Sequence, residues 1–309
     1  MAESNEITTP VSAAAKLRNL LARKDKILVC PGVYDGITAR IALKAGFECL
    51  YMTGAGTTAS RLGMPDLGVI TLNDMRDTAG MLASLDPTVP VIADADTGYG
   101  GPIMVGRTVT SYMRAGVAGL HLEDQVVTKR CGHLMHKQLV PENEFLSRIH
   151  AAVLARSSVP AGDIVIIART DALQSFGYEI ACDRLKKAIA LGADVAFLEG
   201  VRSVEEARRI CEDLAPTPVL YNCVAGGESP VWTAAEARDL GYKIVIHPAF
   251  ALAPVFSAVT DAAKALKGTG AMSEAEKLTS PKAMFEVCGL NEAVAFDIAA
   301  GGKLFSEGV

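Results

Sequence analysis

Short apolar runs, each bounded by turn residues, alternate along the chain with segments whose apolar positions have helical spacing. The runs predict eight strands, over residues 27–33, 48–53, 89–94, 119–123, 164–169, 195–199, 218–222 and 243–247. Helices are predicted over residues 13–24, 36–45, 71–85, 104–115, 142–156, 178–191, 203–214 and 233–240. Glycines end several helices, as left-handed C-caps do: Gly46, Gly116, Gly192 and Gly241. This alternation over ~250 residues is typical of an α/β fold, the (β/α)8 TIM-type barrel.

The alternative fold is a doubly wound sheet. It predicts a G-x-G-x-x-G motif after the first strand, and residues 31–36, PGVYDG, do not match that motif. The tail beyond Lys264 is helical but is interrupted at residues 268–270 and 280–281, and it is longer than one closing helix requires. We therefore expect a single barrel domain over residues 1–309, with a loose N-terminus (1–12) and a C-terminal helical arm (265–309) that packs on a neighbouring subunit.

The third predicted strand leads into two aspartates on alternate positions, Asp94 and Asp96. In an extended chain both side chains point to one side, where two like charges repel unless a cation or a proton lies between them. Glu123 ends the next strand, and carboxylates on adjacent strands suit Mg²⁺ or Mn²⁺ with water as the remaining ligands. The alternative is an acidic cluster paired with arginine or lysine.

Polar residues also end nearly all of the remaining predicted strands. The active site of a barrel lies at these strand ends. The polar residues are Tyr34, Asp35, Thr53, Asp124, Arg169, Thr170, Asp171, Glu199, Asn222 and His247, followed by Pro248. The turn formed by Gly54, Ala55 and Gly56 offers backbone N–H groups to a carboxylate or phosphate. Arg169 suits a carboxylate or a developing oxyanion, although an arginine alone is more often a salt-bridge partner.

The loop after the fourth strand contains Lys129, Arg130, Cys131, Gly132 and His133 in sequence. Neighbouring cations lower the pKa of a cysteine from ~8.5 towards neutrality, which makes Cys131 a candidate acid, base or nucleophile. Gly132 lets the backbone approach a ligand closely. The alternative is a surface thiol in a basic loop.

Composition narrows the class of protein. The 309 residues are 50% hydrophobic and 21% charged, with a net charge of −5, and no basic stripe indicates a nucleic-acid partner. No apolar segment approaches the ~20 residues of a membrane span. The seven cysteines are scattered and indicate reduced thiols. The first residues lack a secretory signal, so we expect a cytoplasmic protein, with mitochondrial or peroxisomal placement left open.

Three motifs resemble the isocitrate lyase/phosphoenolpyruvate mutase superfamily: DADTGYGG from Asp94, HLEDQ from His121 and KRCGH from Lys129. The resemblance covers the chain from about Ala13 to beyond Pro248. It implies a barrel whose last helix is swapped between subunits, usually in a homotetramer. It also implies Mg²⁺ or Mn²⁺ held, partly through water, by Asp94, Asp96, Glu123 and Asp66. A gating loop containing Cys131, Gly132 and His133 would close over a small di- or tricarboxylate, bound with the help of Tyr34, Thr53, Gly54, Ala55, Arg169, Glu199 and Asn222.

Within that resemblance, Cys131 indicates the branch of carbon–carbon lyases, because mutases and phosphonate hydrolases generally lack this cysteine. Three activities remain: 2,3-dimethylmalate lyase, 2-methylisocitrate lyase and oxaloacetate acetylhydrolase. The last typically has a serine at the end of the eighth strand, where this chain has Pro248, so a substituted malate is favoured as substrate. A Schiff-base aldolase would need a lysine at a strand end, and none of the eight predicted strands has one. A non-catalytic metabolite-binding barrel is a further alternative.

The resemblance suggests retro-aldol cleavage. A divalent cation would lower the pKa of the 2-hydroxyl, and Arg169 and Asn222 would offset the charge that develops as the C2–C3 bond breaks. Cys131 would protonate the carbanion. Tyr34, Glu199 and a metal-bound water are the three candidate bases.

Overall fold

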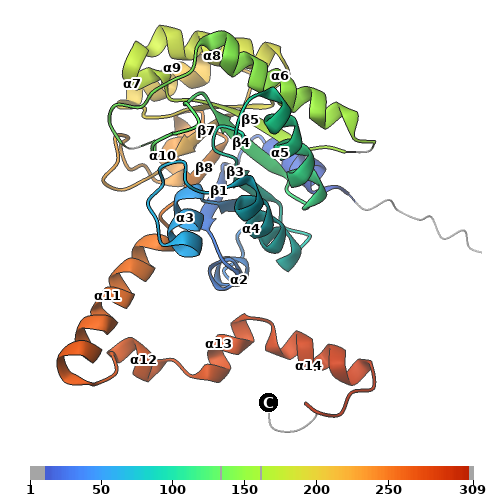
Figure 1. The fold of residues 1–309 in the computed structure, drawn as a ribbon, viewed down its shortest axis with the longest axis vertical. Helices are drawn as coiled ribbons and strands as arrows, with labels where there is room; N and C mark the ends of the chain where they lie inside the picture. Colours follow the sequence, from blue (N-terminus) through green and yellow to red (C-terminus); the bar gives the residue numbers. More distant parts are fainter. Residues whose placement is uncertain (1–10, 133, 161, 306–309) are drawn as a thin grey trace, which may run out of the picture.

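Eight parallel strands close into one barrel in sequence order. The structure is a computed structural model that describes residues 11–305 except residues 133 and 161. The strands are β1 (Leu28–Val33), β2 (Leu50–Met52), β3 (Val91–Asp94), β4 (Gly119–Glu123), β5 (Val165–Thr170), β6 (Val195–Leu198), β7 (Val219–Asn222) and β8 (Ile244–His247). Pairing of β8 with β1 closes the ring (Figure 1). The predicted TIM-type barrel is confirmed, and the doubly wound alternative is wrong.

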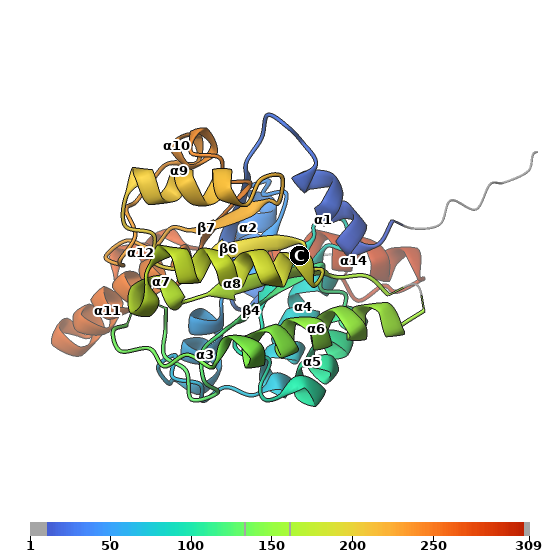
Figure 2. The same ribbon diagram turned by 90° about the horizontal axis from the view of Figure 1, so that it is seen from above.

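Helices surround the barrel (Figures 1 and 2). They are α1 (Ala13–Leu21), α2 (Gly36–Lys44), α3 (Gly54–Leu62), α4 (Leu72–Leu85), α5 (Pro102–Arg114), α6 (Glu142–Ser158), α7 (Ala172–Phe176), α8 (Tyr178–Ala190), α9 (Val204–Asp213) and α10 (Ala234–Asp239). All four glycines expected to end helices have the positive φ of left-handed or related backbone, between 82° and 111°.

The strands are buried on both faces, which is why they are almost continuously apolar. On β5, Ile166 packs outward against the helices, while the adjacent Ile167 packs inside the barrel. Phe197 of β6 and Leu220 of β7 also fill the interior. This close-packed double core is a rigid support for the residues at the carboxyl ends of the strands.

Two helices in the loops above the strands were not predicted, α3 and α7. Residues 54–56, expected as a turn, are the first turn of α3, because Thr53 caps the helix: its Oγ1 accepts from the N–H of Gly56 at 3.3 Å. The N–H of Gly56 is therefore used inside the cap, and the role of this turn in binding an anion stays a prediction.

The C-terminal arm consists of α11 (Leu252–Thr269), α12 (Glu274–Leu278), α13 (Pro281–Val287) and α14 (Leu290–Ala299). Figure 1 shows it leaving the barrel at α11 and running below it. The predicted start at residue 265 lies inside α11, whereas both predicted interruptions coincide with helix boundaries. None of the residues in these four helices is buried. No helix among the described residues has the length and apolarity that a membrane crossing requires.

Candidate active site

A cavity of about 210 Å³ lies at the carboxyl ends of the barrel strands. Ten of the predicted site residues line it: Thr53, Ala55, Asp66, Asp94, Cys131, Gly132, Arg169, Glu199, Asn222 and Pro248. Tyr51, Lys129, Val224, Ala249 and Leu252 complete the lining. Residues far apart in the sequence converge here because every parallel strand of a barrel ends at the same rim.

The other predicted site residues lie around this cavity. Within the described part of the chain, Tyr34, Gly54, Asp96 and Glu123 do not line it, and His133 lies outside the described residues. Tyr34 packs against Gly56, where an added Cβ would lie 2.7 Å from the tyrosine ring. A Cβ on Gly54 would lie 2.3 Å from Oδ2 of Asp94, so this glycine leaves room for the carboxylate.

Three buried carboxylates form an acidic cluster beside the cavity. Burial raises the pKa of Asp94 and Glu123, and it raises that of Asp96 to about 6. The expectation that Asp94 and Asp96 alternate along an extended chain is wrong in its geometry. Strand β3 ends at Asp94, and Asp96 has a φ of 47°, from which its N–H donates to Oδ1 of Asp94 at 2.8 Å. Both side chains nevertheless belong to the one acidic cluster.

Lys129 reaches into this cluster from the loop after β4. Its Nζ lies 2.5 Å from Asp66 and 2.6 Å from Asp96. Burial alone would lower the pKa of Lys129, but the surrounding carboxylates, Asp96 and Glu123 foremost, outweigh burial and raise it well above its usual value. The lysine is therefore a protonated ammonium, which cannot attack a carbonyl as a Schiff-base nucleophile. The sequence analysis named Lys129 only as a neighbour of Cys131. Its place among these carboxylates was not predicted, because the residue comes from a loop and not from a strand end.

Arg169 connects the carboxylates on the other side of the cavity. Its Nη1 and Nη2 lie 3.3 Å from Glu123 and Glu199 respectively, and its Nε donates to Asp171 at 2.9 Å. Against the effect of burial, Arg169 and Lys137 lower the pKa of Asp171 to about 2. These contacts fix a permanently charged guanidinium at the cavity wall.

The backbone at Cys131 approaches the cavity closely. The N–H of Cys131 donates to the carbonyl of Asp66 at 3.1 Å. A Cβ on the next residue, Gly132, would lie 2.3 Å from Nη2 of Arg169 and 3.0 Å from Oε2 of Glu199. A larger residue here would displace the ends of Arg169 and Glu199, whereas the predicted close approach of Gly132 to a ligand stays a prediction.

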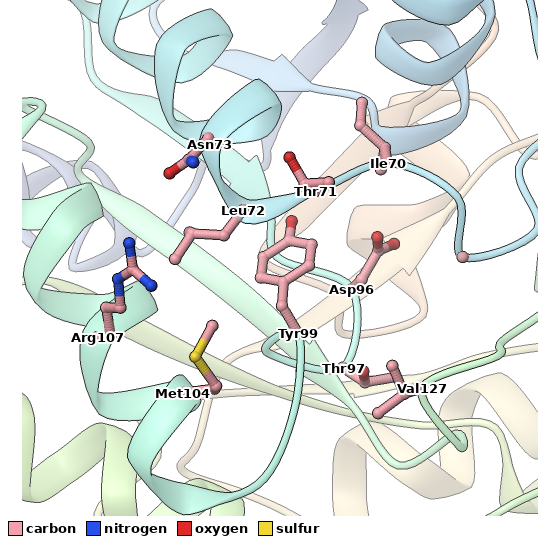
Figure 3. A pocket seen from close by; sticks show the side chains of 11 residues that line it. Ile70, Thr71, Leu72, Asn73, Asp96, Thr97, Tyr99, Met104, Arg107 and Val127 are labelled. Carbon is pink, nitrogen blue, oxygen red and sulfur yellow. The ribbon is translucent and has the colours of Figure 1, made fainter.

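A second cavity, of about 330 Å³, lies on the other side of Asp96 (Figure 3). Its lining includes Thr71, Asn73, Tyr99 and Arg107. Asp96 is the one predicted site residue among the described residues that line it. The acidic cluster thus stands between two cavities, and most of the predicted substrate-binding residues that the structure describes line the smaller one.

The chain has relatives of known name. The family model described as phosphoenolpyruvate phosphomutase matches residues 17–267. A 2,3-dimethylmalate lyase from Eubacterium barkeri is 42% identical over 257 residues, which cover 83% of this chain and 87% of the relative. A crystal structure of 2,3-dimethylmalate lyase is 52% identical, with a TM-score of 0.94, over 97% of this chain and 99% of the other. An oxaloacetate acetylhydrolase, in complex with the inhibitor 3,3-difluorooxalacetate, is 53% identical, with a TM-score of 0.92, over 96% of this chain and 100% of the other.

Proposed function

The chain belongs to the phosphoenolpyruvate mutase/isocitrate lyase superfamily, and from that premise we propose that it is a carbon–carbon lyase. Its proposed substrate is a substituted 2-hydroxy dicarboxylate, such as 2,3-dimethylmalate, which it cleaves to an α-keto acid and a carboxylic acid. The observation that carries this proposal is the small cavity that Cys131, Arg169 and Glu199 line together. An acid, a charge stabiliser and a carboxylate base are the groups that retro-aldol cleavage requires.

Proton transfers follow from the positions of these groups. Of the candidate bases, Glu199 lines the cavity, whereas Tyr34 packs outside it with a pKa raised by burial and by Asp35. We therefore assign Glu199 to accept the proton of the 2-hydroxyl. As the C2–C3 bond breaks, its electrons pass to C3 and the adjacent carboxylate. Arg169 offsets that charge, and the thiol of Cys131 gives its proton to the carbon.

The acidic cluster suits a hard divalent cation, Mg²⁺ or Mn²⁺. All its donors are carboxylate oxygens, and burial keeps the pKa of Asp94, Asp96 and Glu123 raised although Lys129 and Arg169 act in the opposite direction, so a further positive charge would be favoured here. Among the described residues, no three His, Cys, Asp or Glu side chains form a ready set of direct ligands. We propose that Asp94, Asp96, Glu123 and Asp66 would hold the cation, partly through water. The cation would supply Lewis-acid activation of the substrate hydroxyl.

Pro248 bears on the choice between two of the candidate activities. The similarity to dimethylmalate lyase and to oxaloacetate acetylhydrolase is nearly equal, at 52% and 53% identity, so overall likeness does not distinguish them. Pro248 lines the cavity, and its backbone is held against Gly32, where an added Cβ would lie 2.4 Å from the Pro248 carbonyl oxygen. A side chain at this position therefore faces the substrate from a fixed backbone. A serine there would offer a hydroxyl to hydrated oxaloacetate, and proline does not.

We expect Pro248→Ser to raise kcat/KM for oxaloacetate, relative to 2,3-dimethylmalate, by about tenfold or more, the value of one hydrogen bond to a charged group. Steady-state assays with 2,3-dimethylmalate, 2-methylisocitrate and oxaloacetate measure the ratio. Pro254→Ser, on the exposed face of the arm, is the control and should leave the ratio unchanged. If the native enzyme itself is most active on oxaloacetate, the substituted-malate proposal is wrong and the acetylhydrolase alternative is correct.

We propose that the arm packs on a second copy of the chain, within a homotetramer. Large apolar side chains stand in solvent along it: Phe256 is 73% exposed, Leu278 86% and Phe296 77%. A surface of this kind marks an association site. Phe256→Glu should weaken association at least ~10-fold, since burying one such side chain is worth about 1.5–3 kcal/mol. Sedimentation velocity measures this, with Lys264→Gln in the same helix as control. A native protein that sediments as a monomer would contradict the proposal.

A further inference from the structure

The loop that contains Cys131 has a fixed neck. Between β4 and α6, the N–H of Val126 donates to the carbonyl of Gln138 at 2.9 Å, and the N–H of Val140 donates to that of Asp124 at 2.9 Å. The chain between residues 126 and 138 therefore leaves the barrel and returns to it at one point. The loop can open and close about this point, and it stays closed only if other contacts hold its tip.

Two buried side chains hold the tip. Gln125 bonds both backbone groups of Arg130: its Nε2 donates to the carbonyl at 2.9 Å, and its Oε1 accepts from the N–H at 3.1 Å. Lys137 holds the other side of Cys131, where its Nζ donates to the carbonyl of Gly132 at 2.7 Å. Gln125 is 0% exposed and Lys137 6%. The peptide groups on both sides of the thiol are thus fixed.

Each of these side chains also reaches a carboxylate of the site: Nε2 of Gln125 donates to Oε1 of Glu123 at 3.0 Å, and Lys137 makes an ion pair. The same Nζ lies 2.7 Å from Oδ1 of Asp171. Asp171 also accepts from Nε and Nη2 of Arg169, at 2.9 and 3.1 Å. A continuous path of charge-assisted hydrogen bonds therefore leads from the backbone of Gly132, through Lys137 and Asp171, to the guanidinium at the cavity wall.

We propose that Lys137 is a positioning residue that latches the Cys131 loop in its closed conformation and couples closure to the placement of Arg169. This inference rests on the proposed function for its meaning, since it aligns the proton donor with the group that stabilises charge. An ammonium suits the position because its three donors can serve a carbonyl and a carboxylate at once. Opening the loop breaks the bond to Gly132 and leaves the buried Lys137–Asp171 pair as a ready docking point for return.

The test compares loop opening in the native enzyme and in Lys137→Met, without substrate. Opening is measured by alkylation of Cys131 with iodoacetamide, quantified by peptide mapping, and by tryptic cleavage after Arg130. We expect both to be about tenfold or more faster in Lys137→Met, the value of a lost hydrogen bond to a charged donor. Lys187→Met removes a lysine that pairs with Asp183 and Glu142 on the surface, and should match the native enzyme.

Lys137→Arg retains charge and donors, and is expected to restore much of the protection. If Lys137→Met does not fold, Asp171→Asn tests the same latch by weakening the anchor of Lys137. Native rates of both alkylation and cleavage in a folded variant would overturn the proposal. Neither readout requires turnover. The role of Lys137 can therefore be refuted without affecting the proposed reaction, and the proposed reaction can be refuted without affecting the role of Lys137.

Discussion

The Cys131→Ala variant is expected to turn over about 10²–10⁴-fold more slowly than the native enzyme, the usual contribution of a positioned general acid. Cys131 lines the cavity together with Arg169, and the carbonyl of the next residue, Gly132, accepts a hydrogen bond from Lys137. Removing the thiol leaves the carbanion without a nearby proton donor but takes no charge from the wall that holds the substrate. Binding of a small dicarboxylate should therefore persist.

Two measurements separate these effects. Single-turnover assays with 2,3-dimethylmalate report the chemical step, and thermal stabilisation by oxalate in the presence of Mg²⁺ reports binding. Cys131→Ser is expected to be nearly as slow as the alanine variant, because a hydroxyl is a much weaker acid than a thiol. Cys288→Ala, in the exposed arm, should be fully active. Near-native turnover by Cys131→Ala would remove the acid role from this residue.

The sequence was sufficient to predict the strand-end residues of this site. Arg169, Glu199 and Asn222 lie at or within one residue of the ends of three successive strands, and the closure of parallel strands into a barrel brings them to one rim whatever connects them. Because the strands are buried on both faces, they could be predicted from continuous apolar runs in the sequence. Gly132 was singled out from the sequence as a place where the backbone could approach a ligand, and in the structure it lies against the ends of Arg169 and Glu199.

The loop residues were not predictable in the same way. Lysine side chains are usually exposed, yet Lys129 and Lys137 are buried. Their burial depends on the path of an irregular loop, which the spacing of apolar residues does not predict. Asp96 follows the strand in a left-handed conformation, so alternation misjudged its direction. From the sequence, a metal site and an acidic cluster paired with lysine or arginine were two separate alternatives. In the structure the same carboxylates pair with Lys129 and also suit a cation.

Removal of divalent cations is expected to lower turnover of 2,3-dimethylmalate by at least ~10³-fold, since Lewis-acid activation contributes several kcal/mol. Extensive dialysis against EDTA, followed by assay with and without added Mg²⁺ or Mn²⁺, measures the effect. Independently of activity, a cation present at ~100 times its Kd should stabilise the fold by about 2.7 kcal/mol. Asp94→Asn should lose both responses, while Asp183→Asn, an exposed acid in α8, should keep them.

The pH dependence of that stabilisation distinguishes the acidic cluster from an adventitious site. The pKa of Asp96 is raised to about 6 and that of Glu123 is raised well above its usual value, so protons compete with the cation as the pH falls. Stabilisation by Mg²⁺ should therefore be larger at pH 8 than at pH 5.5, whereas surface carboxylates with ordinary pKa values would show little change over this range. Full turnover in EDTA would instead mean that the ammonium of Lys129, which already lies between Asp66 and Asp96, provides the positive charge that this cluster needs.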